Sequence, residues 1–223
     1  MASCRGLLSC DELERAAKFF KPNDAKSFIL CRGLLRRILG ESLDVDPSTL
    51  VFEFNGHGKP FLENTNLEFN VSHSRDRLLI AVTFGRAVGV DIEFRRNNVN
   101  MDAIAERWFA PEECALSQGA PARSNIEGEN STGPFFDIWA KKEAYVKALG
   151  QGIFKKFDTF AVPLGNEPGV PMIGIHDANG VKNKAWFFQT LEIDPAYATA
   201  LVSESPAVPV RLRTLSAEQI VRP

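Results

Sequence analysis

The pattern of hydrophobic and polar positions alternates between helical and strand periods along the chain. Apolar residues at helical spacing predict helices over residues 11–20, 24–39, 101–108 and 135–149. Alternation of period two predicts strands over residues 67–71, 78–84 and 88–93. After Gly152 the pattern predicts mainly strands, over residues 159–164, 171–176, 185–193, 198–203 and 208–212. A mixture of this kind indicates an α+β protein with small sheets.

The helix predicted over residues 24–39 has an apolar face and a basic face, and Gly40 is expected to end it. The apolar positions expected to face inward are Phe28, Cys31, Leu35, Ile38 and Leu39. The basic positions are Lys26, Arg32, Arg36 and Arg37. A basic helix face is usually solvated surface, so these four gain a functional meaning only if an anion lies beside them.

The helix predicted over residues 135–149 carries charges beside its buried stripe, which is formed by Phe135, Trp139, Val146 and Leu149. Lys142 and Glu143 fall on the two borders of that stripe, and Lys147 lies one turn beyond Glu143. Glu143 and Lys147 can be an ordinary surface pair at four-residue spacing. Alternatively, charges this close to an apolar stripe lie against the protein and need partners there.

The strand predicted over residues 88–93 places two carboxylates on one face. Val88, Val90 and Ile92 point to one side, so Asp91 and Glu93 point to the other, about 6.6 Å apart by strand rise. One cation could touch both side chains, although acids on one face also occur on any half-exposed strand. Gly89, on the same face as the acids, suggests that a ligand or another backbone comes close.

Two other segments carry candidate chemistry. The loop at residues 55–60 has two glycines, Lys59 and Pro60, but lacks the spacing of a P-loop, and no Gly-x-Gly-x-x-Gly follows a strand. His73 lies at a strand end beside Ser72 and Ser74, where it can close a turn or contact a phosphate. Residues 117–134 are rich in Gly, Ser, Asn, Pro and Glu, which predicts a flexible surface loop.

Composition narrows the class of protein. The 223 residues are 44% hydrophobic, with a formal net charge of -2 and a pI near 6.0, which gives no general attraction to nucleic acid or anionic membrane. Four cysteines without a Cys-x-x-Cys pair disfavour a structural zinc site. The chain lacks an N-terminal apolar run and any stretch of about 20 apolar residues. We therefore expect a soluble cytoplasmic protein with reduced thiols.

Taken together, the motifs resemble the surfactin-synthetase type of 4′-phosphopantetheinyl transferase. The resemblance rests on Gly89-Val-Asp-Ile-Glu93 and Trp139-Ala-Lys-Lys-Glu-Ala-Tyr-Val-Lys147, supported by Gly58-Lys-Pro60 and Phe69-Asn-Val-Ser-His73. It implies an α+β fold of two pseudo-symmetric α/β halves, each a small, mainly antiparallel sheet packed against a long helix. The halves would be residues 1–86 and 87–223, the second carrying the metal site, and one monomer would suffice.

The resemblance also implies an activity and a set of site residues. Such an enzyme transfers 4′-phosphopantetheine from coenzyme A to a serine of an apo carrier protein of fatty-acid, polyketide or nonribosomal-peptide synthesis, and releases adenosine 3′,5′-bisphosphate. By resemblance, Asp91, Glu93 and Glu143 bind Mg²⁺, Glu143 deprotonates the serine, Lys147 holds the pyrophosphate and Lys142 supports the site. The implied coenzyme A contacts are Lys26, Arg32, Gly58, Lys59, Pro60, Ser72, His73 and Lys147.

The sequence departs from the family pattern at two places, and two other functions remain as alternatives. Ala140 stands where the family usually has Ser or Thr, and the basic run before the long N-terminal helix is thinned to residues 23–26. The alternatives are a metal-dependent phosphohydrolase of a bisphosphate nucleotide and a non-catalytic coenzyme A or carrier-protein binding module. For a carrier protein, we expect the docking surface to lie around Trp108, Phe109 and the loop at residues 117–134.

Overall fold

The computed structural model describes residues 2–97, 100–119, 133–152, 156–165, 172–173, 186–204 and 209–215. It divides into two compact units: unit 1 is Met1–Phe52 with Pro209–Pro223, and unit 2 is Glu53–Val208. Helices and small antiparallel sheets confirm the predicted α+β class. The predicted division near residue 86 stays a prediction. No helix in the described ranges is both long and apolar enough to cross a bilayer, and all four cysteines are free thiols.

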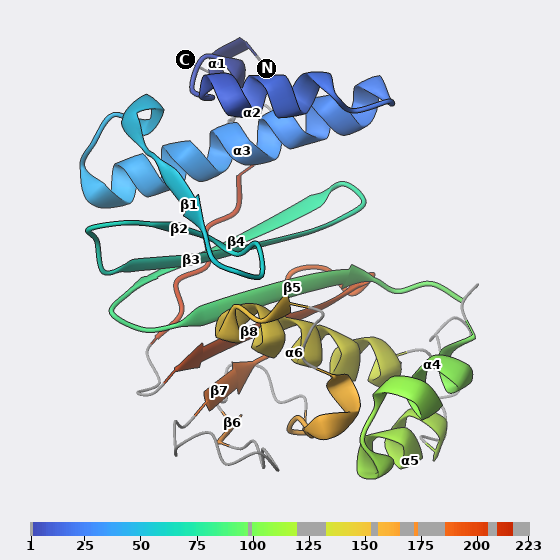
Figure 1. Ribbon diagram of the computed structural model, residues 1–223. Helices are drawn as coiled ribbons and strands as arrows, with labels where there is room; N and C mark the ends of the chain where they lie inside the picture. The colour runs from blue at the N-terminus through green and yellow to red at the C-terminus, as the bar shows by residue number, and fades with distance from the viewer. Residues whose placement is uncertain are drawn as a thin grey trace. The chain divides into compact units, whose positions relative to one another are not determined.

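Unit 1 is built on one long helix. The helices α1 (Ala2–Arg5) and α2 (Cys10–Ala17) lie along α3 (Pro22–Leu43), and the 3-10 turn η1 (Pro47–Thr49) follows (Figure 1). Cys4 and Leu8 pack with Ala16 of α2 and Ile29 of α3 in a small core. Gly33 allows α1 to approach, because a Cβ there would lie 2.6 Å from Cys4 Cβ. The unit's core therefore depends on close contact between α1 and α3.

The predicted end of α3 at Gly40 is wrong. The helix continues to Leu43 and ends at Asp44, which adopts a left-handed conformation at φ 55°. Gly40 instead makes room for the returning chain, since a Cβ there would lie 2.8 Å from Pro47 Cγ and 2.9 Å from Val45 O. A glycine needed for packing is therefore easily mistaken for a helix stop.

The interpretation of the basic face of α3 as solvated surface is also wrong for Arg36, which is 1% exposed. Its Nε donates to Glu12 Oε2 at 2.7 Å, and its Nη1 donates to the carbonyls of Pro47 and Leu50 at 3.0 and 2.9 Å. Arg32 Nε lies 3.3 Å from Glu12 Oε1. Two of the four basic residues thus belong to a buried network that joins α2 to α3.

Unit 2 contains small sheets. β1 (Phe52–Phe54), whose first residue closes unit 1, pairs with β2 (Pro60–Leu62), and β3 (Leu67–Ser74) pairs antiparallel with β4 (Arg77–Phe84). The third sheet has the order β5-β8-β7-β6. Its strands are antiparallel and comprise β5 (Val88–Phe94), β6 (Met172–Ile173), β7 (Trp186–Gln189) and β8 (Tyr197–Glu204). Among the described strands, β5 is therefore an edge strand that pairs with β8 alone.

Part of the predicted C-terminal strand pattern is wrong. Residues 157–159 form the 3-10 turn η3 (Phe157–Thr159), and residues 160–165 have no regular structure, partly because Val162 N donates to a Glu113 carboxylate oxygen rather than to a neighbouring strand. Residues 209–212 are likewise irregular. Of the strand predicted over residues 171–176, only the part that forms β6 is described. The first residues of the strands predicted over 185–193 and 208–212 also lie outside the described ranges.

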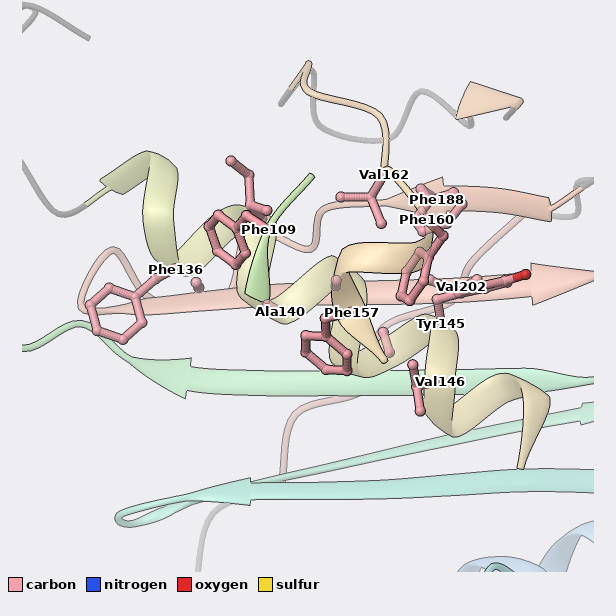
Figure 2. Close-up of a cluster of buried hydrophobic side chains, with 14 of the residues drawn as sticks. Phe109, Phe136, Ala140, Tyr145, Val146, Phe157, Phe160, Val162, Phe188 and Val202 are labelled. Carbon is pink, nitrogen blue, oxygen red and sulfur yellow. The ribbon is translucent and has the colours of Figure 1, made fainter. Parts of the chain in front are cut away.

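The core of unit 2 lies between α6 (Gly133–Leu149) and the third sheet. Figure 2 shows Tyr145 and Val146 of α6 gathered with Phe160, Phe188 and Val202 from the surrounding chain. The helices α4 (Met101–Trp108) and α5 (Pro111–Gly119) precede α6 along the chain. The loop predicted over residues 117–134 begins within α5 and ends within α6, and residues 120–132 lie outside the described part of the chain. The α6 helix is thus fixed by an aromatic core on one side.

Candidate functional site

The edge strand β5 meets α6 backbone to backbone at Gly89. A Cβ on Gly89 would lie 1.9 Å from Ala144 O and 2.4 Å from Ala148 N, the two atoms that α-helical geometry joins in one hydrogen bond. The predicted close approach at Gly89 is therefore confirmed, and the neighbour is the backbone of α6. On the opposite face of β5, Val88, Val90 and Ile92 are buried against other apolar residues.

Asp91 is the most buried carboxylate of this region, at 2% exposure. Its Oδ1 accepts hydrogen bonds from Lys147 Nζ at 2.6 Å and from Ser72 Oγ at 2.8 Å. Its Oδ2 is buried and has no hydrogen-bond partner among the described residues. One carboxylate oxygen is therefore fully used, and the other retains an unsatisfied acceptor.

Ser72 links β3 to this pair. Its hydroxyl donates to Asp91 and accepts from Lys147 Nζ at 3.0 Å and from Ile92 N at 3.3 Å. A serine hydroxyl has one proton and two lone pairs, so its capacity is used completely. The side chains of Asn70 and Ser74, two residues to each side, likewise accept from N–H groups of β5, at 2.9 and 3.0 Å. Alternate polar side chains of β3 thus satisfy the open edge of β5.

Two further carboxylates approach Asp91 closely enough to repel it. Burial raises the pKa of Glu93 to about 7, and the charge of Asp91 adds to the rise while Lys147 and Arg96 oppose it. Burial also raises the pKa of Glu143, again with repulsion from Asp91 and opposition from Lys147. The positive charge of Lys147 therefore does not balance the carboxylates that come together here, Asp91 and Glu93 from β5 and Glu143 from α6.

This charge balance allows a test of whether the residues fit a divalent cation. No group of three or more His, Cys, Asp or Glu side chains within the described ranges already surrounds a point where a metal could sit. The chemistry of the donors nevertheless fits, because hard cations take carboxylate oxygens and Asp91 Oδ2 is an unsatisfied buried acceptor beside two acids of raised pKa. Asp91, Glu93 and Glu143 are therefore the side chains that could hold such an ion.

Lys142 is not brought to these carboxylates. It is fully buried, and its Nζ lies 2.7 Å from Glu113 Oε2 and donates to the carbonyls of Phe157 and Phe160 at 2.7 and 2.6 Å. Glu113 also accepts from Ala110 N and Val162 N. Lys142 thus joins α5, α6 and residues 157–162, and its expected position at the border of the helix stripe is wrong. The only signal for Glu113 in the sequence is its place three residues after Ala110 at a helix start.

The loop before β2 contacts the C-terminal end of α6, where Lys147 lies. Lys59 Nζ donates to the carbonyls of Val88 and Ala148 at 3.4 and 3.3 Å, and burial lowers the pKa of Lys59 against the opposing charge of Glu68. Gly58 adopts a left-handed conformation, at φ 85°, and Pro60 begins β2. His73 is exposed on β3, next to Ser72. Lys59, like Ser72, therefore has its polar atoms engaged with the protein itself.

Lys26 and Arg32 belong to unit 1. Lys26 is exposed on α3. Arg32 pairs with Glu12, and its guanidinium lies 4.8 Å from the centre of the Phe52 ring. Burial lowers the pKa of Arg32. Their contact with coenzyme A stays a prediction from resemblance.

An α+β unit that sets three carboxylates beside a lysine is typical of proteins that bind phosphate groups through a divalent cation. Comparison with known proteins specifies the class. Residues 87–202 match the model of the 4′-phosphopantetheinyl transferase superfamily, and residues 2–84 match that of the 4′-phosphopantetheinyl transferase N-terminal region. The first model covers more than half of the chain, and the protein belongs to the 4′-phosphopantetheinyl transferase superfamily.

Curated relatives agree with this membership. The chain is 40% identical over 152 residues to the 4′-phosphopantetheinyl transferase HetI of Nostoc sp. strain PCC 7120, which covers 66% of this chain and 62% of HetI. It is 31% identical over 217 residues to psf-1 of Bacillus pumilus, covering 96% of this chain and 86% of psf-1. It is 26% identical over 215 residues to Sfp of Bacillus subtilis strain 168, covering 96% and 90%. The chain thus spans about three fifths of HetI and most of the Bacillus proteins.

Proposed function

We propose that the protein transfers the 4′-phosphopantetheinyl group of coenzyme A to a serine of an apo carrier protein. The observation that carries this proposal is the partly buried contact of Lys147 Nζ with Asp91 Oδ1 at 2.6 Å, with Glu93 and Glu143 close enough to repel Asp91. All four residues lie within the segment that matches the superfamily model. Positive and negative groups are thereby held together as phosphoryl transfer requires.

Mg²⁺ fits this site, and Asp91, Glu93 and Glu143 would hold it. When bound, the ion would neutralise charge on the pyrophosphate of coenzyme A during transfer. The protein prepares for such an ion by burying carboxylates whose mutual repulsion a cation relieves, which supports the choice of these three residues.

Lys147 and Glu143 have separate roles in the proposed reaction. Lys147, partly exposed in the last turn of α6, turns from Asp91 to a pyrophosphate oxygen of coenzyme A. Glu143 takes the proton of the carrier serine, directly or through one water. The serine oxygen forms a bond to the β-phosphorus as the bond to the leaving oxygen breaks. That oxygen keeps the electron pair as adenosine 3′,5′-bisphosphate departs.

Other residues are proposed to bind coenzyme A. The loop with Gly58, Lys59 and Pro60 borders the adenine, and exposed His73 contacts the 3′-phosphate, with Lys26 and Arg32 adding positive charge. Ser72 would contact a phosphate only by exchanging one of the three hydrogen bonds it now makes. In the unliganded protein Ser72 therefore holds Asp91 and Lys147 in place.

The partner is proposed to be an apo carrier protein of fatty-acid, polyketide or nonribosomal-peptide synthesis. Trp108 and Phe109 at the end of α4 remain the proposed docking region. Phe109 is 4% exposed and stacks on Phe135 at 5.2 Å, which makes Phe109 a support for that surface rather than a contact. Cytoplasmic location and a monomeric state belong to the same proposal.

The mass of an apo carrier tests the proposal. The protein is incubated with coenzyme A, Mg²⁺ and a panel of apo carriers of the three classes, and each intact carrier is weighed. We expect the mass to rise by one phosphopantetheinyl group when Mg²⁺ is present. Release of phosphopantetheine or phosphate with every carrier unmodified would favour the phosphohydrolase alternative, and binding of coenzyme A without either product would favour the binding module.

The variant Glu143→Gln tests Glu143 in both of its proposed roles, as the base and as a metal ligand. It removes the proton acceptor while keeping the shape of the side chain, so we expect transfer to fall at least 100-fold, the lower range for general-base catalysis. Glu192→Gln, a change of the same type at a carboxylate outside the site, serves as the control and should react normally. Near-normal transfer by the Glu143 variant would remove Glu143 from the mechanism.

A further inference from the structure

Asn55 connects the loop before β2 to the C-terminal end of α6. Within the loop, its Oδ1 accepts from His57 N and from Lys59 N, both at 2.9 Å. Its Nδ2 donates to Gly150 O at 2.9 Å, a contact that joins residues 95 positions apart. One amide side chain thus shapes the loop and ties it to α6.

The end of α6 is shaped to receive this amide. Gly150 adopts a left-handed conformation at φ 68°, and its N–H donates to Lys147 O at 3.1 Å, which closes the last turn. A Cβ at Gly150 would lie 2.8 Å from Asn55 Nδ2 and 3.3 Å from Lys59 Cδ. Glycine is therefore needed here both for its backbone conformation and for the approach of Asn55.

Lys59 adds a second contact to the same turn. Its ammonium donates to Ala148 O, one of the terminal carbonyls that α6 leaves without a helical partner, and to Val88 O at the start of β5. A positive charge at a helix C-terminus is stabilising. Asn55 and Lys59 together thus hold the end of α6 against the first residue of β5.

Lys147 lies in this last turn, directly before the carbonyls that Asn55 and Lys59 engage. In the unliganded protein its ammonium lies 2.6 Å from Asp91 Oδ1, and the end of the turn that carries it is held by the contacts of Asn55 with Gly150 and of Lys59 with Ala148. We propose that Asn55 is a positioning residue that fixes Lys147 through Gly150, so that the loop and the pyrophosphate-binding lysine act as one body. The part of this proposal that concerns turnover rests on the proposed function.

One consequence is a link between the two ends of coenzyme A. The loop proposed to border the adenine is the loop that holds Lys147, which is proposed to bind the pyrophosphate. Occupying the loop would therefore stabilise the last turn of α6, and adenosine 3′,5′-bisphosphate, which lacks the pantetheine arm, should do so alone.

Two variants test the role of Asn55, because they separate its two functions. Asn55→Ala removes all three hydrogen bonds of the side chain, whereas Asn55→Asp keeps the acceptor within the loop and replaces the donor to Gly150 O with a carboxylate oxygen that repels that carbonyl. Asn66→Ala, at an exposed asparagine of the same unit, is the matched control. Hydrogen exchange, read by mass spectrometry on a peptide covering residues 146–151, and steady-state transfer are measured for each.

We expect both Asn55 variants to exchange about tenfold faster at residues 146–151, the effect of losing one intramolecular hydrogen bond, with normal exchange in β3 and β4. We also expect kcat to fall about tenfold with KM for the carrier unchanged. In a Lys147→Arg background, Asn55→Asp should lower kcat by less than twofold further, because Asn55 acts through Lys147.

Normal exchange at residues 146–151 in Asn55→Asp would overturn the proposal, and so would a full tenfold loss of kcat in the Lys147→Arg background. If the parent protein modifies no carrier, the proposed function fails and the exchange measurement alone decides whether Asn55 holds the turn. The two failures are thereby distinguishable.

Discussion

Replacing Gly89 with alanine probes the contact on which the geometry of the site depends. The added Cβ would lie 1.9 Å from Ala144 O, whereas ordinary contacts begin at 3.4 Å, so α6 and β5 must separate by about 1.5 Å. Both opposing atoms belong to the α6 backbone, and they cannot turn aside as a flexible side chain could. The strain therefore falls on the packing of the helix against the sheet.

The magnitude follows from the cost of overpacking. Forcing extra atoms into a packed interior costs up to about 3 kcal/mol, and for a chain of this size that corresponds to a fall of about 6–12 °C in melting temperature. A shift of about 1 Å in a catalytic group can also cost about 100-fold in rate. We therefore expect Gly89→Ala to melt at lower temperature and to transfer at least 100-fold more slowly.

Thermal unfolding followed by circular dichroism and the carrier mass assay measure both effects. Gly133→Ala is the matched control, because a Cβ at Gly133 meets only Arg95 Nη1, at an ordinary contact distance of 3.8 Å, and it should behave as the parent protein does. If Gly89→Ala melted within about 2 °C of the parent and kept its activity, the reasoning from backbone contact would be refuted.

Three further predictions concern buried charges. Because the pKa of Glu93 rises from 4.5 to about 7 on folding, its contribution to the stability of the metal-free protein is fully present below pH 4.5 and is lost as the pH rises through about 7. Denaturant midpoints at pH 5 and pH 8 should therefore differ less in Glu93→Gln than in the parent; an equal difference would contradict the shift. Lys142→Met should lower the free energy of unfolding by about 3–5 kcal/mol, because it leaves Glu113 buried without its partner. Adding Glu113→Gln should recover part of this loss. Additive losses of the two variants in denaturant unfolding would contradict the pair. Arg36→Met should destabilise unit 1 by a similar amount, read as faster hydrogen exchange in α2 and α3, and unchanged exchange would argue against the buried pair with Glu12.

Local periodicity was sufficient to predict a helix or strand whose position is determined by its own residues. The helix predicted over residues 101–108 coincides with α4, and the strand predicted over residues 88–93 coincides with all but the last residue of β5. Placing Asp91 and Glu93 on the opposite face from Val88 needed only the two-residue repeat of a strand. These features could be predicted because neighbouring side chains determine them.

Features that depend on distant partners could not be predicted in this way. Arg36 is buried because Glu12 lies beside it, and Lys142 is buried because Glu113 faces it from α5. Gly40 looks like a helix stop until the returning chain at Pro47 is placed. In each case the local pattern is the same for a solvated and a buried charge, or for a capping and a packing glycine.

The same limit applied to the candidate site. The acidic residues and Lys147 could be proposed from two motifs, but Ser72 was considered only as a phosphate contact. Its position between Asp91 and Lys147 depends on how β3 meets the edge of β5, and Asn55 has no motif of its own. Residues that hold other residues in place leave little trace in a single sequence.

The central claim is that Asp91, Glu93 and Glu143 hold one divalent cation on which transfer to a carrier depends. Anomalous X-ray scattering from a crystal grown with coenzyme A and Mn²⁺, in place of Mg²⁺, tests this most directly. We predict a single manganese peak bound by carboxylate oxygens of these residues, with Lys147 Nζ moved from Asp91 to the pyrophosphate. A manganese peak elsewhere, or bound coenzyme A with Lys147 still on Asp91 and no metal beside it, would contradict the claim.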